Sequence, residues 1–364
     1  MDKPVRIGLD TEFVRERTYW PKLALVQIAA ITREQQSDPA ASDEPDILLV
    51  DPLAPGMPAA LAPLLADPAI LKITHSASED LVALQHTCGV APQPLFDTQI
   101  AAALAGLGAG LGYQKLVQQL TGLELAKGQT RSDWLRRPLS PEQRQYASDD
   151  VRYLETLYQT LDARLRTLGR EAWLEQDCAR LVSVAERDVD ERWPHLSLRA
   201  AQFLDANAQR RLLRLLRWRQ TQARASDRPR NWILDNELAV TLARTPPADE
   251  AALRQRLQSD PKAPRKLAPQ LWLALTTPLA DETQAPLLSA EDRDRKAMVR
   301  KLQDAVAILA RELDLPEGVL ASRRWLEALL DGQWPPALLG WRRDLLEPRL
   351  APLLATGPNA DTAV

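Results

Sequence analysis

Two acidic residues, Asp10 and Glu12, stand two positions apart in the apolar stretch of residues 5–13, VRIGLDTEF. Because side chains alternate along an extended chain, a strand here places both carboxylates on one face, with Ile7 and Leu9 on the other. Adjacent carboxylates repel each other and lose hydration when buried, so a cation is expected between them. Mg²⁺ prefers carboxylate oxygens and keeps water ligands for a phosphate substrate. The pair therefore predicts a divalent-metal site at the end of a strand.

Acid pairs of this spacing also occur in polar surroundings elsewhere in the chain. Asp188 with Asp190 and Asp292 with Asp294 are of this kind, and their context is typical of solvated surface. The apolar strand distinguishes Asp10 from these pairs. Even so, a metal site needs further ligands from other parts of the chain.

A third acid, Asp150, comes with an aromatic partner on a predicted helix. Residues 140–143, SPEQ, have the capping-box pattern, improved by proline at the first helical position. Tyr146 and Asp150 are four residues apart and so share one face of this helix. Asp149 is rotated by about 100° and cannot point into the same site. Taken alone, Tyr146 would be a core aromatic and Asp150 a solvated acid; their combination with the first pair favours a site.

A fourth acid, Asp80, lies near another predicted helix start. Residues 76–79, SASE, repeat the capping-box pattern and predict a helix from Glu79 towards His86. Asp80 then falls in the first turn, where the helix N-terminus favours negative charge.

The elements around these residues indicate a mixed α/β domain. Residues 23–31 and 47–50 are predicted strands that follow the first in antiparallel order, joined by a flexible loop over residues 32–46. Helices then alternate with strands, and the helix opened at residue 140 runs towards Leu168 along a leucine stripe. The further predictions are a helix at 59–65 and strands at 71–74 and 95–96.

The bulk composition is that of a globular protein, with 45% hydrophobic and 26% charged residues. A chain of 364 residues is expected to form two or three domains. Cys88 and Cys178 provide neither zinc-ligand spacing nor a disulfide framework. No signal region and no apolar run of about 20 residues is present, which predicts a cytoplasmic protein without a membrane span.

The second half of the chain reads as helices only, after a boundary near residues 188–197. Residues 206–234 hold eight arginines and one aspartate, mostly on an amphipathic helix over residues 208–224. Such a charge concentration favours contact with a nucleic-acid backbone; the alternative is a solvated arginine face without a ligand. The residues expected to make that contact are Arg210, Arg214 and Arg217.

Taken together, the motifs at residues 10–13, 75–81 and 146–151 resemble the three exonuclease motifs of the DEDD superfamily, and Tyr146 resembles its DEDDy branch. The words at residues 96–99 (FDTQ) and 132–139 (SDWLRRPL) are similar to those of the ribonuclease D family. This resemblance covers residues 4–190. It implies a ribonuclease-H-like fold and an enzyme that hydrolyses RNA from the 3′ end and releases 5′-mononucleotides.

The resemblance also implies roles for five residues around two divalent ions, Mg²⁺ or Mn²⁺. Asp10 would bridge the ions, and Glu12 and Asp150 would complete the tighter site. Asp80 would hold the second ion, and Tyr146 would orient the attacking water. Two such ions can stabilise both the attacking and the leaving oxygen of a phosphoryl displacement.

Three further residues are weaker candidates for RNA contact. Phe13 could wedge beside the terminal base, but a buried strand-end phenylalanine is an equal alternative. His75 could face the scissile phosphate, although a hydrogen-bonded structural histidine is the more economical reading. Arg131 could meet the RNA backbone or be a solvated loop residue.

Residues 228–242 are similar to the HRDC domain, a small helical bundle that commonly contacts nucleic acid. The predicted organisation is an exonuclease domain at 1–190, an HRDC domain at 198–285, a second HRDC-like bundle at 290–355 and a flexible tail at 356–364. The expected function is a metal-dependent, monomeric 3′→5′ exoribonuclease that trims tRNA precursors and other small structured RNAs. A 3′→5′ DNA exonuclease and a catalytically inactive nucleic-acid-binding scaffold are the alternatives.

Overall fold

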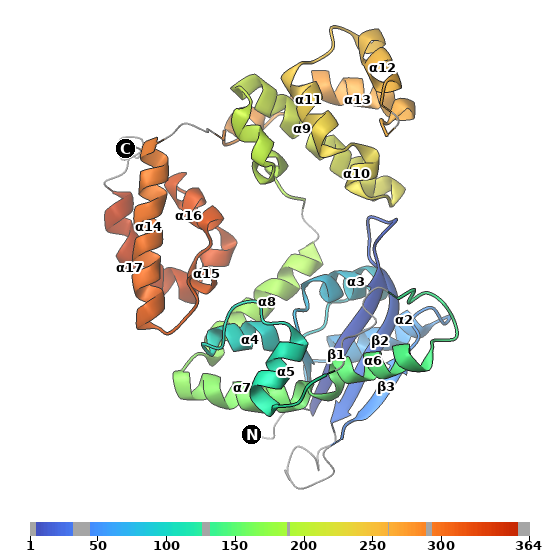
Figure 1. Cartoon of the computed structure of the whole chain (residues 1–364), viewed down its shortest axis with the longest axis vertical. Helices are drawn as coiled ribbons and strands as arrows, with labels where there is room; N and C mark the ends of the chain where they lie inside the picture. The colour runs from blue at the N-terminus through green and yellow to red at the C-terminus, as the bar shows by residue number, and fades with distance from the viewer. Residues whose placement is uncertain are drawn as a thin grey trace. The chain divides into compact units, whose positions relative to one another are not determined.

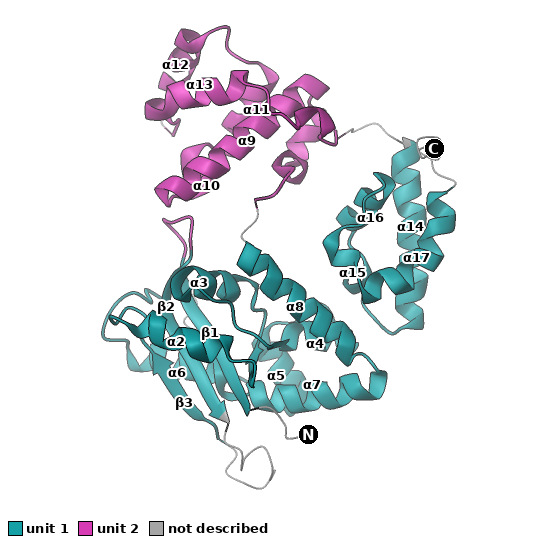
Figure 2. Ribbon diagram, turned by 180° about the vertical axis from the view of Figure 1, so that it is seen from behind, with its two compact units in different colours: residues 1–14, 21–187, 293–364 teal, residues 15–20, 188–292 magenta. Residues whose placement is uncertain are grey.

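The computed structural model describes residues 5–31, 44–125, 132–187, 190–260, 262–288 and 293–355. The chain forms two compact units, shown in different colours in Figure 2. The first contains residues 1–14, 21–187 and 293–364, and the second contains residues 15–20 and 188–292. Most of the predicted loop at residues 32–46 lies outside the described residues.

A five-stranded mixed sheet forms the centre of the first unit, with the strand order β3-β2-β1-β4-β5 (Figure 1). β1 and β2 pair antiparallel, as do β2 and β3, whereas β4 runs parallel to β1 and β5. This arrangement confirms the predicted mixed sheet. The strands are β1 (Val5–Val14), β2 (Lys22–Ile31), β3 (Asp46–Val50), β4 (Ile70–Thr74) and β5 (Leu95–Asp97).

Helices cover both faces of this sheet. On one face, α2 (Met57–Ala66) and α3 (Ser78–Cys88) enclose the β1 side chains Ile7 and Leu9 in a shared apolar cluster. The alternation predicted for β1 is therefore confirmed on this face. The domain also contains α4 (Thr98–Leu104), α5 (Tyr113–Thr121) and α8 (Glu171–Arg187).

The other face of β1 lies under α6 (Pro141–Arg152) and α7 (Leu154–Leu168). Gly8 allows this close approach, because a Cβ there would lie 3.2 Å from Leu154 Cδ1 and 3.1 Å from the Cβ of Ala29. A Cβ at this position would require Ala29 or Leu154 to shift by a few tenths of an ångström, so the glycine favours close packing of α7 on the strand.

The predicted continuous helix over residues 140–168 is wrong, because it is divided at Tyr153. The Tyr113 hydroxyl donates a hydrogen bond to the Asp149 carbonyl at 3.0 Å and accepts one from the Tyr153 amide at 3.1 Å. A side chain from α5 thus satisfies backbone groups that a continuous helix would pair internally. The start of α6 is as predicted, since Ser140 and Gln143 form a capping box.

The predicted capping box at Ser76 is also wrong. The N-cap of α3 is Ala77, and Ser76 has a left-handed φ of 60°. The Ala77 amide instead donates to Asp97 Oδ2 at 2.8 Å, while Asp97 Oδ1 accepts hydrogen bonds from the Gln99 and Ile100 amides at the start of α4. At the start of α3, the hydrogen-bond acceptor for the backbone is therefore a carboxylate from β5 and not the serine that the local sequence predicts.

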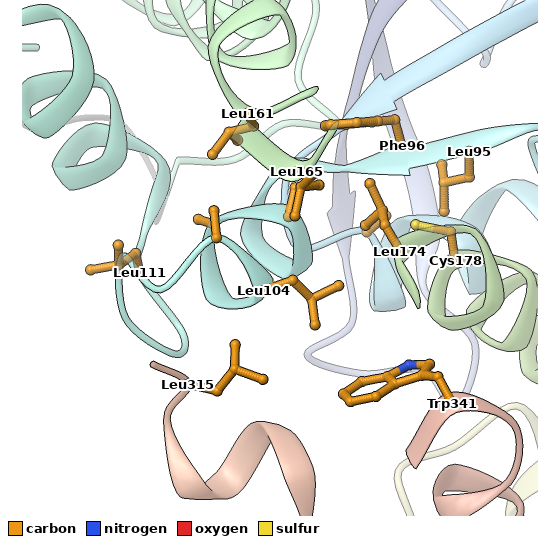
Figure 3. Packing of buried hydrophobic residues seen from close by; sticks show 14 of the residues in the cluster. Leu95, Phe96, Leu104, Leu111, Leu161, Leu165, Leu174, Cys178, Leu315 and Trp341 are labelled. Carbon is orange, nitrogen blue, oxygen red and sulfur yellow. The ribbon is translucent and has the colours of Figure 1, made fainter. Parts of the chain in front are cut away.

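The C-terminal helices of the first unit share a core with the exonuclease helices. Figure 3 shows Leu315 and Trp341 beside Leu104 and Leu174 in one apolar cluster. An Asp177–Arg342 ion pair, nearly enclosed, crosses the same region. That these helices form a second HRDC-like bundle stays a prediction. They are α14 (Arg293–Glu312), α15 (Glu317–Leu320), α16 (Arg323–Leu330) and α17 (Trp341–Leu354), with a 3₁₀ turn at Pro336–Leu338.

The second unit is helical and has its own core. Leu212, Leu215 and Leu216 of α9 are fully buried in it, which confirms the predicted apolar face. None of the helices in the described part of the chain is long and apolar enough to cross a membrane. The α-helices are α9 (Ala206–Ser226), α10 (Arg230–Ile233), α11 (Asn236–Arg244), α12 (Glu250–Gln258) and α13 (Ala268–Thr276), with 3₁₀ turns at Pro194–Ser197, Arg199–Phe203, Arg265–Leu267 and Glu282–Gln284.

Candidate active site

Asp10 and Glu12 project from the face of β1 that α6 and α7 cover, and both remain partly exposed. Further back on the same face, Arg6 is almost fully buried and forms an ion pair with Glu155 of α7 at 2.6 Å. The two acids therefore lie at the open end of an otherwise closed layer. The register of β1 against β2 shifts between Glu12 and Phe13, so the pair stands where the regular strand ends.

Asp150 and Tyr146 reach the same place from α6. The charge of Asp150 acts on both Asp10 and Glu12, and Tyr146 hydrogen-bonds to Asp150. The face predicted from the four-residue spacing therefore points towards the acid pair. Asp149 points away, as predicted, and accepts hydrogen bonds from Gln145 and Arg152.

Asp80 arrives from the first turn of α3. Because β4 runs parallel to β1 and α3 follows it directly, the start of α3 lies at the same edge of the sheet as the end of β1. The Thr11 hydroxyl donates a hydrogen bond to Asp80 Oδ1. The sequence separation of this contact is 69 residues, so only the sheet topology brings the fourth acid to the other three.

The electrostatics show that the four carboxyl groups share one environment. Burial, then the charges of Asp80, Asp150 and Glu12, raises the pKa of Asp10 well above its usual range. Burial and the charges of Asp150 and Asp80 raise the pKa of Glu12 to about 8. Burial also raises the pKa of Asp150 to about 7 and that of Asp80 to about 6, although hydrogen bonds from Tyr146 and Thr11 oppose the rise.

Asp10 and Glu12 feel the charges of the other acids, and burial raises the pKa of Asp80 and Asp150, so the four groups are not all ionised at neutral pH unless positive charge offsets these costs. Oxygen donors of this kind suit Mg²⁺ or Mn²⁺. Among the described residues, no group of three or more His, Cys, Asp or Glu side chains is positioned to hold a metal ion. The fit of this donor set to divalent cations therefore rests on its chemistry and charge.

The Tyr146 hydroxyl remains protonated throughout the neutral range. Burial, followed by the charges of Asp150 and Glu12, raises the pKa of Tyr146 far above its ordinary value. The side chain also packs near Trp134, with ring centroids 6.0 Å apart. Tyr146 can therefore donate a hydrogen bond in the site.

The weaker candidates for RNA contact are differently placed. Both ring nitrogens of His75 are bonded within the domain, Nδ1 to Thr98 at 2.9 Å and Nε2 to the Leu111 carbonyl at 3.0 Å. Phe13 is partly buried against the apolar cluster of β1 and α2. Arg131 lies outside the described residues. RNA contact by these side chains stays a prediction.

Two supporting residues were missed by the sequence reasoning. Tyr113 holds the backbone just after Asp150, as described above, and no local spacing signals this role. Arg137 binds Asp51 at 2.7 Å and the Ala24 carbonyl. It thereby fastens the loop before α6 to the sheet, and its presence in the SDWLRRPL word was the only available signal.

The arginines of α9 make many contacts inside the second unit. Arg214 Nε donates to Glu282 at 2.6 Å, and Arg217 pairs with Asp281 at 2.7 Å. Arg210 contacts Asn207 at 3.3 Å. RNA binding by Arg210, Arg214 and Arg217 stays a prediction, but two of these guanidinium groups already have carboxylate partners.

Comparison with known proteins identifies the family. The profile of a 3′–5′ exonuclease family matches residues 2–166, and that of the HRDC domain matches residues 208–275. Ribonuclease D from Xanthomonas oryzae pv. oryzae is 59% identical over 97% of this chain and 94% of its own length. The chain belongs to the ribonuclease D family. Ribonuclease D from Pseudomonas paraeruginosa is 35% identical over 93% of the chain and 89% of its own length.

The fold agrees with this membership. The crystal structure of Escherichia coli RNase D superposes with a TM-score of 0.78 at 27% identity, covering 96% of this chain and 92% of that one. That protein is an exoribonuclease involved in structured RNA processing. The predicted ribonuclease D fold, a mixed-sheet exonuclease domain followed by helical HRDC structure, is thereby confirmed.

Proposed function

We propose that this member of the ribonuclease D family hydrolyses RNA through two divalent metal ions held by Asp10, Glu12, Asp80 and Asp150. Family membership makes the chain a 3′→5′ exoribonuclease, a hydrolase. The observation that supports the metal assignment is the convergence of four acids from β1, α3 and α6, all with pKa values raised by burial and, for Asp10 and Glu12, by the charges of the other acids. Without cations, the electrostatic interaction among these ionised carboxylates is repulsive. Bound cations attract the carboxylates and make the net electrostatic interaction favourable.

The chain's own residues then have distinct roles. The cations, when bound, supply a water of lowered pKa and stabilise charge on the attacking and leaving oxygens. Asp10 and Glu12 would provide carboxylate oxygens as metal ligands from β1, whose opposite face packs against α2 and α3. Asp150 completes the set from α6, and Tyr146, whose hydroxyl hydrogen-bonds to Asp150 in this structure, would donate that hydrogen to the attacking water instead and so orient it. The products are 5′-mononucleotides and an RNA shortened at its 3′ end.

We propose structured RNAs, including tRNA precursors, as the substrates. Support comes from the E. coli relative, whose description names structured RNA processing. Two alternatives predict different behaviour. A DNA exonuclease would degrade matched DNA as well as RNA, since carboxylates and metal do not read the sugar. A binding scaffold would retain RNA without shortening it.

The decisive experiment follows a 5′-labelled single-stranded RNA with Mg²⁺, with Mn²⁺ and with EDTA, beside a matched DNA. We expect a metal-dependent ladder that shortens from the 3′ end on RNA and much weaker shortening of DNA. Asp10→Asn should abolish turnover, whereas Tyr146→Phe should leave a detectable remnant. Asp149→Asn is the matched control, because this neighbouring acid points away from the site, and it should keep wild-type activity.

Wild-type activity of Asp10→Asn, with contaminating nuclease excluded, would refute the metal assignment. Intact RNA bound in every lane would favour the scaffold. Equal rates on RNA and DNA would favour the less specific exonuclease.

A further inference from the structure

Gln27 is a fully buried polar residue in the middle of β2, with 0% of its surface exposed. Neither its Nε2 nor its Oε1 atom has a hydrogen-bond partner among the described residues. Burying an amide without partners costs free energy, because the hydrogen bonds it makes to water in the unfolded chain are not replaced. A methionine or leucine would fill the same position without that cost, as its apolar neighbours on the strand do.

The position of Gln27 relates it directly to the acid cluster. In the antiparallel β1–β2 pair, Gln27 lies directly opposite Asp10. Residues opposite each other in such a pair point to the same side of the sheet. Gln27 therefore projects from the face that carries Asp10 and Glu12.

The neighbouring contacts agree with this direction. Two residues along β2, Ala29 meets Leu154 of α7 across Gly8. On β3, Leu49 lies opposite Gln27 and packs with Tyr146 and Ala147 of α6. The unpartnered amide is thus enclosed beneath α6, in the same layer as the carboxylates.

We propose that Gln27 is a positioning residue for Asp10, and this inference rests on the proposed metal-dependent function. When cations are bound, Gln27 Nε2 donates a hydrogen bond to the Asp10 carboxylate and fixes the direction of its oxygens. An ionised carboxylate only accepts hydrogen bonds, so the amide donor suits it. Because an amide is neutral, it orients Asp10 without adding charge to a cluster that must hold dications.

Residues that hold metal ligands in place typically contribute about 10–100-fold to metal affinity or activity. The unpartnered amide therefore lowers the stability of the metal-free protein but raises metal affinity or activity. A residue with only a packing role would not show these opposite effects.

The test compares Gln27→Met with wild type by thermal unfolding in EDTA, by Mn²⁺ titration calorimetry and by steady-state kinetics on a short RNA. We expect unchanged or higher metal-free stability, Mn²⁺ affinity about 10–100-fold weaker, and a lower kcat with KM unchanged. Gln27→Leu provides a second apolar side chain should methionine pack poorly. Leu49→Met is the matched control, because it alters the same layer without removing a polar group, and it should keep wild-type Mn²⁺ affinity.

Wild-type Mn²⁺ affinity and kcat in both Gln27 variants would overturn the inference. Lower metal-free stability together with unchanged Mn²⁺ affinity would also overturn it, by showing a packing role. Asp10→Asn, measured in parallel, separates the two levels of the proposal. If that variant binds Mn²⁺ and degrades RNA normally, the metal assignment itself fails; if only the Gln27 variants behave normally, the assignment stands and the positioning role fails.

Discussion

Replacing Glu12 with glutamine should stabilise the metal-free protein while removing its activity. The pKa of Glu12 rises from 4.5 to about 8 in the folded chain because of burial and the charges of Asp150 and Asp80. At about 1.4 kcal/mol per pKa unit, this raised pKa lowers the free energy of unfolding by about 4 kcal/mol at pH 8 and by about 1 kcal/mol at pH 5, both relative to low pH.

The realised gain should be smaller than this difference. Protonation of Asp10 or Asp150 can relieve part of the repulsion in the wild type, and the new amide must find hydrogen bonds of its own. We expect the Glu12→Gln variant to gain about 1–3 kcal/mol at pH 8, or several degrees at about 2–4 °C per kcal/mol for a domain of this size.

The direction of the pH dependence follows from the raised pKa. A carboxyl group that binds its proton more tightly when folded contributes stability fully below its unfolded pKa of 4.5 and loses it as the pH rises through about 8. The advantage of the variant should therefore be largest near pH 8 and vanish near pH 4.5. Added Mg²⁺ or Mn²⁺ should invert the order, because the cations stabilise the charged wild-type cluster.

The measurement is thermal unfolding in EDTA across pH 5–8, repeated with Mn²⁺. Glu79→Gln is the matched control, since this exposed acid lies on α3 beside Asp80, and its effect should be small at every pH. A Glu12→Gln variant that is less stable than wild type in EDTA at pH 8, or equally affected at pH 5, would refute the electrostatic reasoning.

Three other predictions test neighbouring parts of the argument. Tyr113→Phe leaves the Asp149 carbonyl without its hydroxyl partner, while the Tyr153 amide keeps its bond to the Val151 carbonyl. The change should cost about 1–3 kcal/mol in thermal unfolding and lower kcat through Asp150; an unchanged kcat would contradict the link. Arg214→Ala removes the guanidinium that binds both Glu282 oxygens and leaves that nearly buried carboxylate with the Leu279 amide as its hydrogen-bond donor. The change should destabilise the second unit by about 1–3 kcal/mol, and a cycle with Glu282→Gln should show coupling. Mn²⁺ binding should release protons between about pH 6 and 8, where the clustered carboxyl groups titrate, and calorimetry in buffers of different ionisation enthalpy checks this.

The parts of the site that depend on short sequence periods were predictable. Strand alternation placed Asp10 with Glu12, and helical spacing placed Tyr146 with Asp150 while turning Asp149 away. The meeting of these pairs with Asp80 was not derivable from spacing, because it depends on the parallel pairing of β4 with β1. Only the resemblance to ribonuclease D carried that information.

The errors arose where a distant residue replaced a local partner. Ser76 has the sequence of a cap, yet Asp97 of β5 binds the Ala77 amide instead. The helix predicted to pass through Tyr153 ends there because Tyr113 binds the backbone on both sides of the break. In both cases the local pattern was valid, and a side chain brought in by the fold supplied a competing hydrogen bond.

The prediction of nucleic-acid binding from the local arginine count has the same limit, because distant residues pair with these arginines. Eight arginines against one aspartate in residues 206–234 favour nucleic-acid binding as a composition. The carboxylate that pairs with Arg214 belongs to Glu282, 68 residues further along the chain, and no window around α9 contains it. An arginine held by a bidentate carboxylate must break that pair before it can bind phosphate, so its charge attracts RNA less than an unpaired arginine would. The number of arginines therefore sets how many positive groups could bind phosphate, and their pairing with carboxylates determines how many of them are available to an RNA.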